Sequence, residues 1–138
     1  MNSGDVKVTV PVGCLLEHIV NGQKKLIEKY KDIEAKNLGR EVHHYPLNLD
    51  KCQDQQHLKD LAWRVTEEIG EAMNCLKNKP WKNSQMLTDK EHYIEEVADA
   101  LHFFVELCIA SGLDTAEKIY EAYARKHAVN EFRQRTNY

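Results

Sequence analysis

Two pairs of carboxylates at helical spacing are the residues of this sequence best suited to chemistry. Glu68 and Glu71 stand three residues apart in the segment EEIGE, and Glu96 and Asp99 do so in the segment EEVAD. On a helix, residues at that spacing project from one face, where like charges repel by about 0.2–0.5 kcal/mol per pair. A divalent cation with oxygen ligands would offset this repulsion, and Mg²⁺ is typical of sites that handle phosphates.

Four predicted helices position these acids. The spacing of apolar residues predicts helices over residues 13–36, 54–78, 88–111 and 114–132. Capping boxes at Thr88 and Asp114 begin the last two. Gly39, Pro80 and Gly112 follow the first three, as expected of helix stop signals.

The rest of the chain adds no further element. Residues 40–53 are predicted to form a loop, and residues 1–12 an extended arm of alternating valines. No convincing strand or repeat is present. Residues 1–138 are therefore expected to form a single all-α domain, a four-helix bundle.

On a helical wheel, both acid pairs face packed regions. Glu68 falls inside the apolar stripe of the second helix, Glu71 lies at its edge and Glu67 lies further out. Glu96 and Asp99 share a side of the third helix with apolar residues. An ionised acid on an inward face is costly unless it is paired or bound to a metal. One such motif alone is more often a pair of solvated charges, but two on successive helices favour a metal site.

The third helix is apolar on two sides, which a lone four-helix unit does not need. One side carries Ile94, Val97, Leu101, Val105 and Cys108, and the other carries Phe103, Leu107 and Ala110. Such a helix is central. We therefore expect a homodimer or a homotetramer.

Composition excludes several classes of function. The formal net charge of −3 offers no basic footprint for polymeric nucleic acid. The four cysteines form no C-x-x-C motif, which argues against a zinc site and favours a reducing compartment. No apolar run is long enough to span a membrane and no signal-peptide pattern is present. The expected location is the cytoplasm, or the host-cell cytoplasm if the protein is viral.

The last helix carries a basic counterpart to the acids. Lys126, Asn130 and Arg133 recur at i, i+4 and i+7 and share a face. A cation, an amide and a guanidinium in line suit a polyphosphate. Basic residues are also favoured in the last turns of helices, where they complement the dipole. Spacing alone does not decide between these interpretations.

With acids and cations placed, the sequence resembles the all-α nucleoside triphosphate pyrophosphatases, the superfamily of MazG and the dimeric dUTPases. The family pattern of E-E-x-x-E followed by E-x-x-D is matched by EEIGE at 67–71 and EVAD at 96–99. The downstream Lys126, Asn130, Arg133-Gln134 and Tyr138, with Trp81-Lys82, are similar to the branch of dimeric dUTPases and phage dCTPase-dUTPases. The resemblance covers roughly residues 53–138 and implies a MazG-like four-helix fold.

The resemblance also implies an activity and a set of roles. The expected reaction is Mg²⁺-dependent hydrolysis of a dUTP- or dCTP-type triphosphate to the monophosphate and pyrophosphate, with Mn²⁺ as a substitute ion. The metal ligands would be Glu68, Glu71, Glu96 and Asp99, and Glu67 would orient or deprotonate water. The phosphates would be held by Lys126, Asn130 and Arg133.

Further residues have a functional and an ordinary interpretation. Trp81, beside Lys82, is predicted either to stack on a base or to cap a helix. Gln23 on the first helix is a candidate reader of a base edge, although a solvated glutamine is the common case. Asp99 and His102 resemble half of a di-iron site, but no second Glu-x-x-His motif is found. A carboxylate-bridged di-iron protein and a catalytically silent nucleotide-sensing or protein-binding bundle are therefore the alternatives to the enzyme.

Overall fold

The computed structural model describes residues 3–41 and 43–136, and the described chain is all-α, as the sequence predicts. A short 3-10 helix, η1 (Ser3–Asp5), precedes four α-helices. These are α1 (Leu15–Leu38), α2 (Cys52–Asn74), α3 (Lys90–Ala110) and α4 (Ala116–Arg135). None of the described helices combines the length and the apolar character that a membrane crossing requires.

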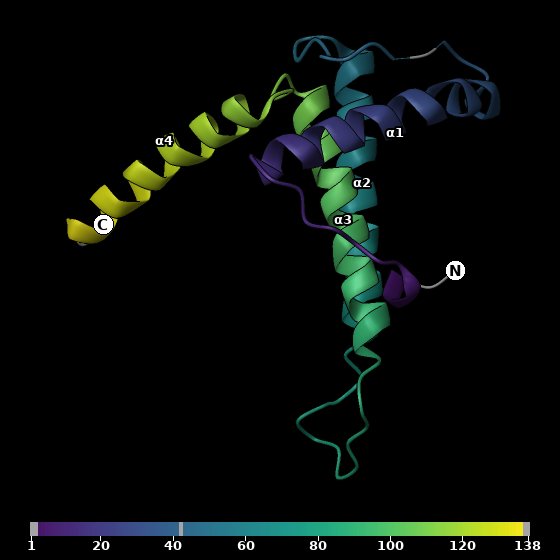
Figure 1. Cartoon of the computed structure of the whole chain (residues 1–138), viewed down its shortest axis with the longest axis vertical. Helices are drawn as coiled ribbons and strands as arrows, with labels where there is room; N and C mark the ends of the chain where they lie inside the picture. Colours follow the sequence, from purple (N-terminus) through teal and green to yellow (C-terminus); the bar gives the residue numbers. More distant parts are fainter. Residues whose placement is uncertain (1–2, 42, 137–138) are drawn as a thin grey trace.

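The helix pair α2–α3 forms the long axis of the molecule (Figure 1). The two helices run antiparallel and pack along their length, and α1 crosses them near one end. The α3 helix contacts α2, α1 and η1, which confirms its predicted central position. The α4 helix projects away from the pair (Figure 1). It packs at its beginning, where Ile119 contacts the buried cluster formed by α1 and α3.

Several predicted helix ends are corrected. The α2 helix ends at Asn74 rather than residue 78, because Asn78 bonds both backbone groups of Met86 (2.8 and 2.9 Å) and draws the chain into a loop. The side chain of Asp89, not Thr88, caps α3 by accepting from the His92 N–H. Likewise Thr115 caps α4.

The other ends differ by a few residues. The α1 helix spans Leu15–Leu38 instead of residues 13–36, and Gly39 follows it in the left-handed region (φ 64°), where glycine is favoured. The α2 helix begins at Cys52, so the predicted loop 40–53 is shortened by two residues. The α4 helix continues to Arg135, three residues beyond the predicted end.

The core lies where α1 crosses the helix pair. One buried cluster joins Val20 of α1 to Val105 and Ile109 of α3. A second joins Leu47 of the preceding loop to Leu61 of α2 and Ala110 of α3, and its backbone is fixed by the Leu47 N–H donating to the Ala110 carbonyl (2.8 Å). The half of α2–α3 beyond these clusters is left without a cover from α1 or α4.

The N-terminal segment lies along that half. The backbone N–H groups of Ser3 and Gly4 donate to the carboxylates of Glu95 (2.7 Å) and Glu91 (2.9 Å) on the first turns of α3. Residues 6–12 then run to α1 with no helix or strand, and their valines are exposed. The described part of the predicted arm is therefore tethered at η1.

Candidate metal centre and adjoining cavities

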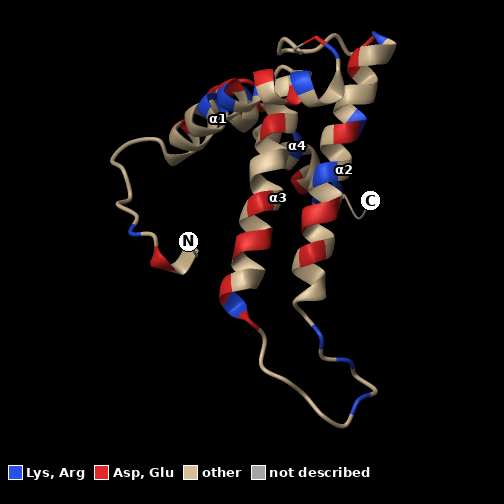
Figure 2. Ribbon diagram, turned by 90° about the vertical axis from the view of Figure 1, so that its right-hand side faces the viewer, with Lys and Arg blue, Asp and Glu red and all other residues tan. Residues whose placement is uncertain are grey.

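The facing sides of α2 and α3 bring the predicted acids together. The carboxylates of Glu68, Glu96 and Asp99 lie within 4.8 Å of one another, a spacing that a single ion can bridge. Glu96 is buried, Glu68 is half-buried and Asp99 is exposed. Figure 2 shows acidic positions in red on the facing helices α2 and α3.

The carboxylates are close enough to alter one another's protonation. Partial burial, then the nearby Glu96, Glu71 and Asp99, raise the pKa of Glu68 to about 7. Hydrogen-bonding distance to Glu96 raises the pKa of Glu71 as well. Each proton that these groups retain relieves like-charge repulsion, so the cluster is electrostatically unfavourable by itself.

The donor set fits Mg²⁺. Oxygen ligands at the end of short side chains are those that this hard cation prefers. Among the described residues, no lysine or arginine forms an ion pair with Glu68, Glu71, Glu96 or Asp99. A histidine does approach the cluster: His92 Nε2 lies 3.4 Å from Glu96 Oε1. The acids thus lack the counter-charge that a structural ion-pair network would have.

The two remaining acids of the motif flank this cluster. Glu71 lies one turn further along α2 and interacts with Glu96, so it can join as a fourth ligand. Glu67 is exposed on α2 and does not belong to the group of three converging carboxylates. This placement agrees with the helical wheel, on which Glu67 lies outside the inward face.

A cavity of about 400 Å³ opens on one side of the cluster. Asp99 belongs both to the acid cluster and to the lining of this cavity, which extends between α1 and the helix pair. Its walls include Tyr30 of α1 and Phe103 of α3, and Arg64 lies over the Phe103 ring at 5.9 Å from the centroid. The volume is within the range of sites that bind small molecules.

The far end of this cavity is polar and buried. Gln23, a predicted base reader, is only 6% exposed and lines it. His57 and Glu106 also line it, and both bond the Tyr45 hydroxyl. Sequence reasoning missed Tyr45, His57 and Glu106. The signal was available, because His57 and Glu106 each precede a fully buried apolar residue, Leu61 or Ala110, by one helical turn.

A second cavity, also of about 400 Å³, lies on the other side of the cluster. Glu71 and His92 line it, together with Lys77 and other residues of the loop that joins α2 to α3. This loop carries lysines at the end of an acidic helix pair (Figure 2). The acids therefore lie between two cavities, each of which also contains basic side chains: Lys31 and Arg64 line the first, and Lys77 lines the second.

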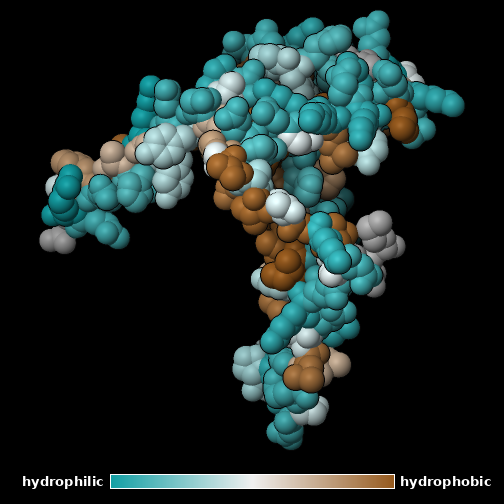
Figure 3. All heavy atoms as spheres, viewed as in Figure 1, coloured by the Kyte–Doolittle hydropathy of each residue, from teal (hydrophilic) through white to brown (hydrophobic). Residues whose placement is uncertain are grey.

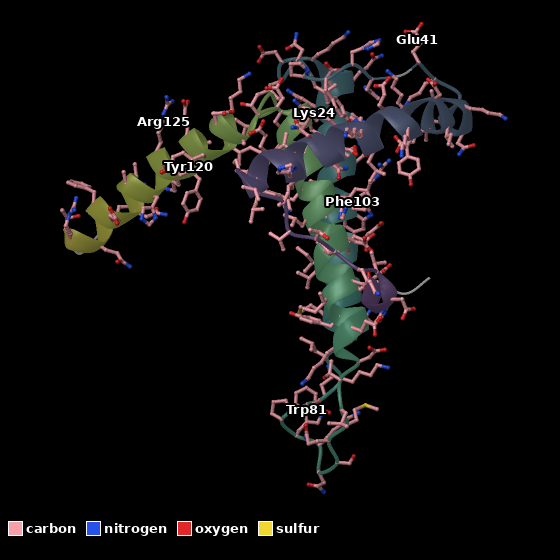
Figure 4. The ribbon with its side chains drawn as sticks, in the orientation of Figure 1. Lys24, Glu41, Trp81, Phe103, Tyr120 and Arg125 are labelled. Atoms are coloured by element: carbon pink, nitrogen blue, oxygen red, sulfur yellow. The ribbon has the colours of Figure 1, made fainter. Side chains whose placement is uncertain are left out.

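Trp81 and Lys82, the aromatic and basic pair of the loop, lie apart from the acids. Trp81 is 77% exposed near the end of the molecule, far along the helix pair from Phe103 (Figure 4). Its ring is approached by Lys79 Nζ, at 5.8 Å from the centroid, rather than by Lys82. Neither Trp81 nor Lys82 lines the cavities that contain the acids.

The structure does not bring the predicted phosphate-binding residues to the acids within one chain. Lys126, Asn130 and Arg133 are exposed on α4. This helix projects away from α2 and α3, as the labelled Tyr120 and Arg125 show in Figure 4. Neither cavity beside the acids is lined by a residue of α4.

The di-iron alternative finds no support in the geometry. His102 lies one turn beyond Asp99, but its Nδ1 bonds the Ala98 carbonyl of the preceding turn (2.8 Å). Among the described residues, the converging group contains carboxylates and no histidine. The cluster therefore has the donor set of a Mg²⁺ site rather than a Glu-x-x-His di-iron site.

Two acid pairs facing each other across antiparallel helices, with a cavity on either side, define an all-helical protein with a candidate metal centre. A family model described as dUTPase matches residues 47–118, more than half of the chain. The chain belongs to this dUTPase family, whose members are all-helical and MazG-like. No significant similarity was found to a curated protein or to a solved structure.

The family match confirms the resemblance seen in the sequence. It covers α2 and α3, and with them all five acids of the two motifs. Membership supports hydrolysis of a nucleoside triphosphate. The match ends before Lys126, Asn130 and Arg133, and it begins after Gln23.

Proposed function

We propose that this chain hydrolyses a pyrimidine deoxynucleoside triphosphate of the dUTP or dCTP type to the monophosphate and pyrophosphate, with Mg²⁺ at the acid cluster. The observation that carries the proposal is the convergence of Glu68, Glu96 and Asp99 within 4.8 Å in a chain of the dUTPase family. A triphosphate is too negative to approach these acids unless cations lie between them.

The order of features along the helix pair supports one orientation of the substrate. The first cavity leads from the buried Gln23 and His57 to Asp99, and Glu71 lines the second cavity, which contains Lys77. A nucleoside in the first cavity would place its phosphates beside the acids and its terminal phosphate toward the lysines of the loop. Lysines are common phosphate binders.

The roles of the acids follow from their positions. Glu68, Glu71, Glu96 and Asp99 would hold Mg²⁺, which neutralises charge on the phosphates and activates water. Mn²⁺ has the same preference for oxygen ligands and is expected to substitute. Glu67, exposed just outside the cluster, would orient the attacking water or accept its proton.

We also propose that the active form is a homodimer or homotetramer. Outside the core, one face of α3 has large apolar side chains that are 43–60% exposed: Ile94 (60%), Val97 (43%), Leu101 (49%) and Phe104 (51%). They recur at i, i+3, i+7 and i+10 and so form an apolar strip on one face of α3, and Figure 3 shows apolar residues gathered along the helix pair. A strip of this kind on an otherwise polar chain is typical of a protein interface.

A second copy would also give α4 a role. In one chain, Lys126, Asn130 and Arg133 lie on a helix that projects away from the acids. The same helix exposes Tyr120, Tyr123 and Phe132. We propose that α4 packs on a second copy of the chain, where its cations contact the phosphates. Contacts of α4 with a triphosphate thus depend on assembly.

The proposal is tested by incubating the protein with Mg²⁺ and dUTP, dCTP, dATP or dGTP, and measuring pyrophosphate. Pyrimidine triphosphates are expected to be cleaved, and Asp99→Asn is expected to abolish cleavage while leaving the far-UV circular dichroism unchanged. Asp32→Asn, an exposed aspartate of α1 outside both cavities, is the control and should retain full turnover.

Three results would contradict the proposal in whole or in part. Near wild-type turnover in Asp99→Asn would remove this residue from the ligand set. Nucleotide binding without pyrophosphate release would identify the chain as a silent nucleotide sensor instead. A purine preference would overturn the pyrimidine assignment alone.

A further inference from the structure

The side chains that face each other across α2 and α3 change in character along the helix pair. The two helices run antiparallel, and facing side chains pair in order along them: Glu71 with Glu96, Glu68 with Asp99, and Arg64 with Phe103. Arg64 lies four residues before Glu68, which is about 6 Å along the helix axis. On the side of the first cavity, the two acidic turns are therefore followed by a turn with a guanidinium and an aromatic ring.

The guanidinium of Arg64 has N–H donors that the described chain does not use. It carries five donors. Its ionic partner among the described residues is Glu34 of α1, whose Oε1 lies 3.6 Å from Nη1, which is longer than a hydrogen bond. The Phe103 ring holds the cation by its charge, at 5.9 Å from the centroid. The Arg64 side chain is 30% exposed, so a ligand in the first cavity can reach its donors.

The other basic side chains of the first cavity differ from Arg64. Lys31 Nζ lies 2.6 Å from Glu28 Oε1, and this hydrogen bond raises the pKa of Lys31. His57 is neutral, because burial lowers its pKa to about 4. Among the described cations that line the cavity, Arg64 is therefore the one whose donors are open to an anion.

A phosphate fits the position of this cation. Guanidinium groups bind phosphate through two parallel N–H bonds, a geometry that lysine cannot offer. A phosphate held by metal ions at Glu68 and Asp99 lies one helical turn from Arg64, a distance that an arginine side chain can span. With the nucleoside in the first cavity, the phosphate nearest to Arg64 is the one attached to the sugar.

We propose that Arg64 binds the α-phosphate of the nucleotide, and that this contact makes the site bind nucleotides in preference to nucleosides. The proposal rests on the proposed function, since that function places the phosphates beside the acids. It adds a residue that lies outside both acid motifs and outside the basic face of α4. The contact survives the reaction, because the α-phosphate stays with the monophosphate product.

A purely structural role does not account for Arg64 equally well. Its link to Glu34 joins α1 to α2, but the two side chains are 30% and 41% exposed and their charged atoms are 3.6 Å apart. Ion pairs of this kind contribute little to stability. Glu34 and Phe103 act instead as positioning residues, because they hold the guanidinium over the cavity from two sides.

The experiment measures the dissociation constants of dUMP and deoxyuridine, and of dCMP and deoxycytidine, by calorimetry in Mg²⁺. None of these ligands can release pyrophosphate, so turnover does not enter. The readout is the ratio of the nucleoside constant to the nucleotide constant, for the base that binds more tightly. In Arg64→Gln this ratio should fall by about 10- to 100-fold, as for a lost hydrogen bond to a charged group, while nucleoside affinity stays within about twofold of wild type.

Two further variants separate charge, geometry and position. Arg64→Lys keeps the charge but loses the bidentate fork, so it should recover part of the ratio. Arg125→Gln is the matched control, because Arg125 is 83% exposed on α4 and lines neither cavity beside the acids. Its ratio should equal that of wild type.

A measurement on the wild-type protein covers the case in which Arg64→Gln fails to fold. In ¹⁵N-labelled protein, the Arg64 Nε–H resonance should shift with the nucleotide and stay in place with the nucleoside. An unchanged ratio in Arg64→Gln, an equal loss of nucleoside and nucleotide affinity, or a resonance that neither nucleotide shifts would overturn the proposal. A ratio that depends on Arg64 in a protein that releases no pyrophosphate from any triphosphate would instead contradict the proposed function alone.

Discussion

The substitution Glu68→Gln tests whether the acids converge, and this test does not require measurement of turnover. The pKa of Glu68 is raised from 4.5 to about 7 in the folded chain. A carboxyl with a raised pKa destabilises the fold wherever it is ionised, because it loses its proton less readily than in the unfolded chain. Metal-free stability should therefore fall as the pH rises from about 4.5 through about 7.

The magnitude follows from the same shift. At 1.36 kcal/mol per pKa unit, the whole shift corresponds to about 3 kcal/mol. Water reaches this half-buried side chain and screens its interactions, so we expect about 1 kcal/mol. Glu68→Gln should be more stable than wild type by that amount at pH 8 in EDTA, and equal to it below pH 4.5.

The assay is urea unfolding with EDTA at several pH values, repeated with Mg²⁺. Glu67→Gln, the exposed neighbour on the same helix, is the control and should change the free energy of unfolding by less than about 0.5 kcal/mol. Mg²⁺ should stabilise wild type more than Glu68→Gln, because binding to the folded state is weakened by the lost ligand. Equal stabilities at pH 8, or a Mg²⁺ effect that Glu68→Gln leaves unchanged, would refute the acid cluster.

Two further predictions concern assembly and the phosphates. Leu101→Asp should convert the oligomer to a monomer in light scattering at micromolar concentration. Leu49→Asp, at an exposed leucine outside the strip, should leave the oligomer intact. A monomeric wild-type protein would refute the proposed assembly. Lys126→Ala should raise KM for all triphosphates similarly, by about tenfold for a lost charged hydrogen bond, and this effect should disappear in the Leu101→Asp background. An undiminished effect in that monomer would place Lys126 at its own chain's site.

The sequence predicted correctly those features that depend on residues close together within one helix. Periodicity within one helix placed Glu68 and Glu96 on inward faces, and the structure finds them facing each other. Glycine after the first helix was predicted and is found in the left-handed region at Gly39. Helix ends were less predictable, because they depend on competing side chains such as Asn78 and Thr115.

The sequence by itself determined the all-α class, the four helices and the two acid pairs, because helical spacing fixes which residues share a face. Only the tertiary structure decided which faces meet. The bonds that join Tyr45 to His57 and Glu106 cross 12 and 61 residues of sequence, and no spacing within one helix encodes them. The direction of α4 could not be predicted from the sequence either. Apolar residues on a helix indicate that it packs on another surface, but they do not identify that surface.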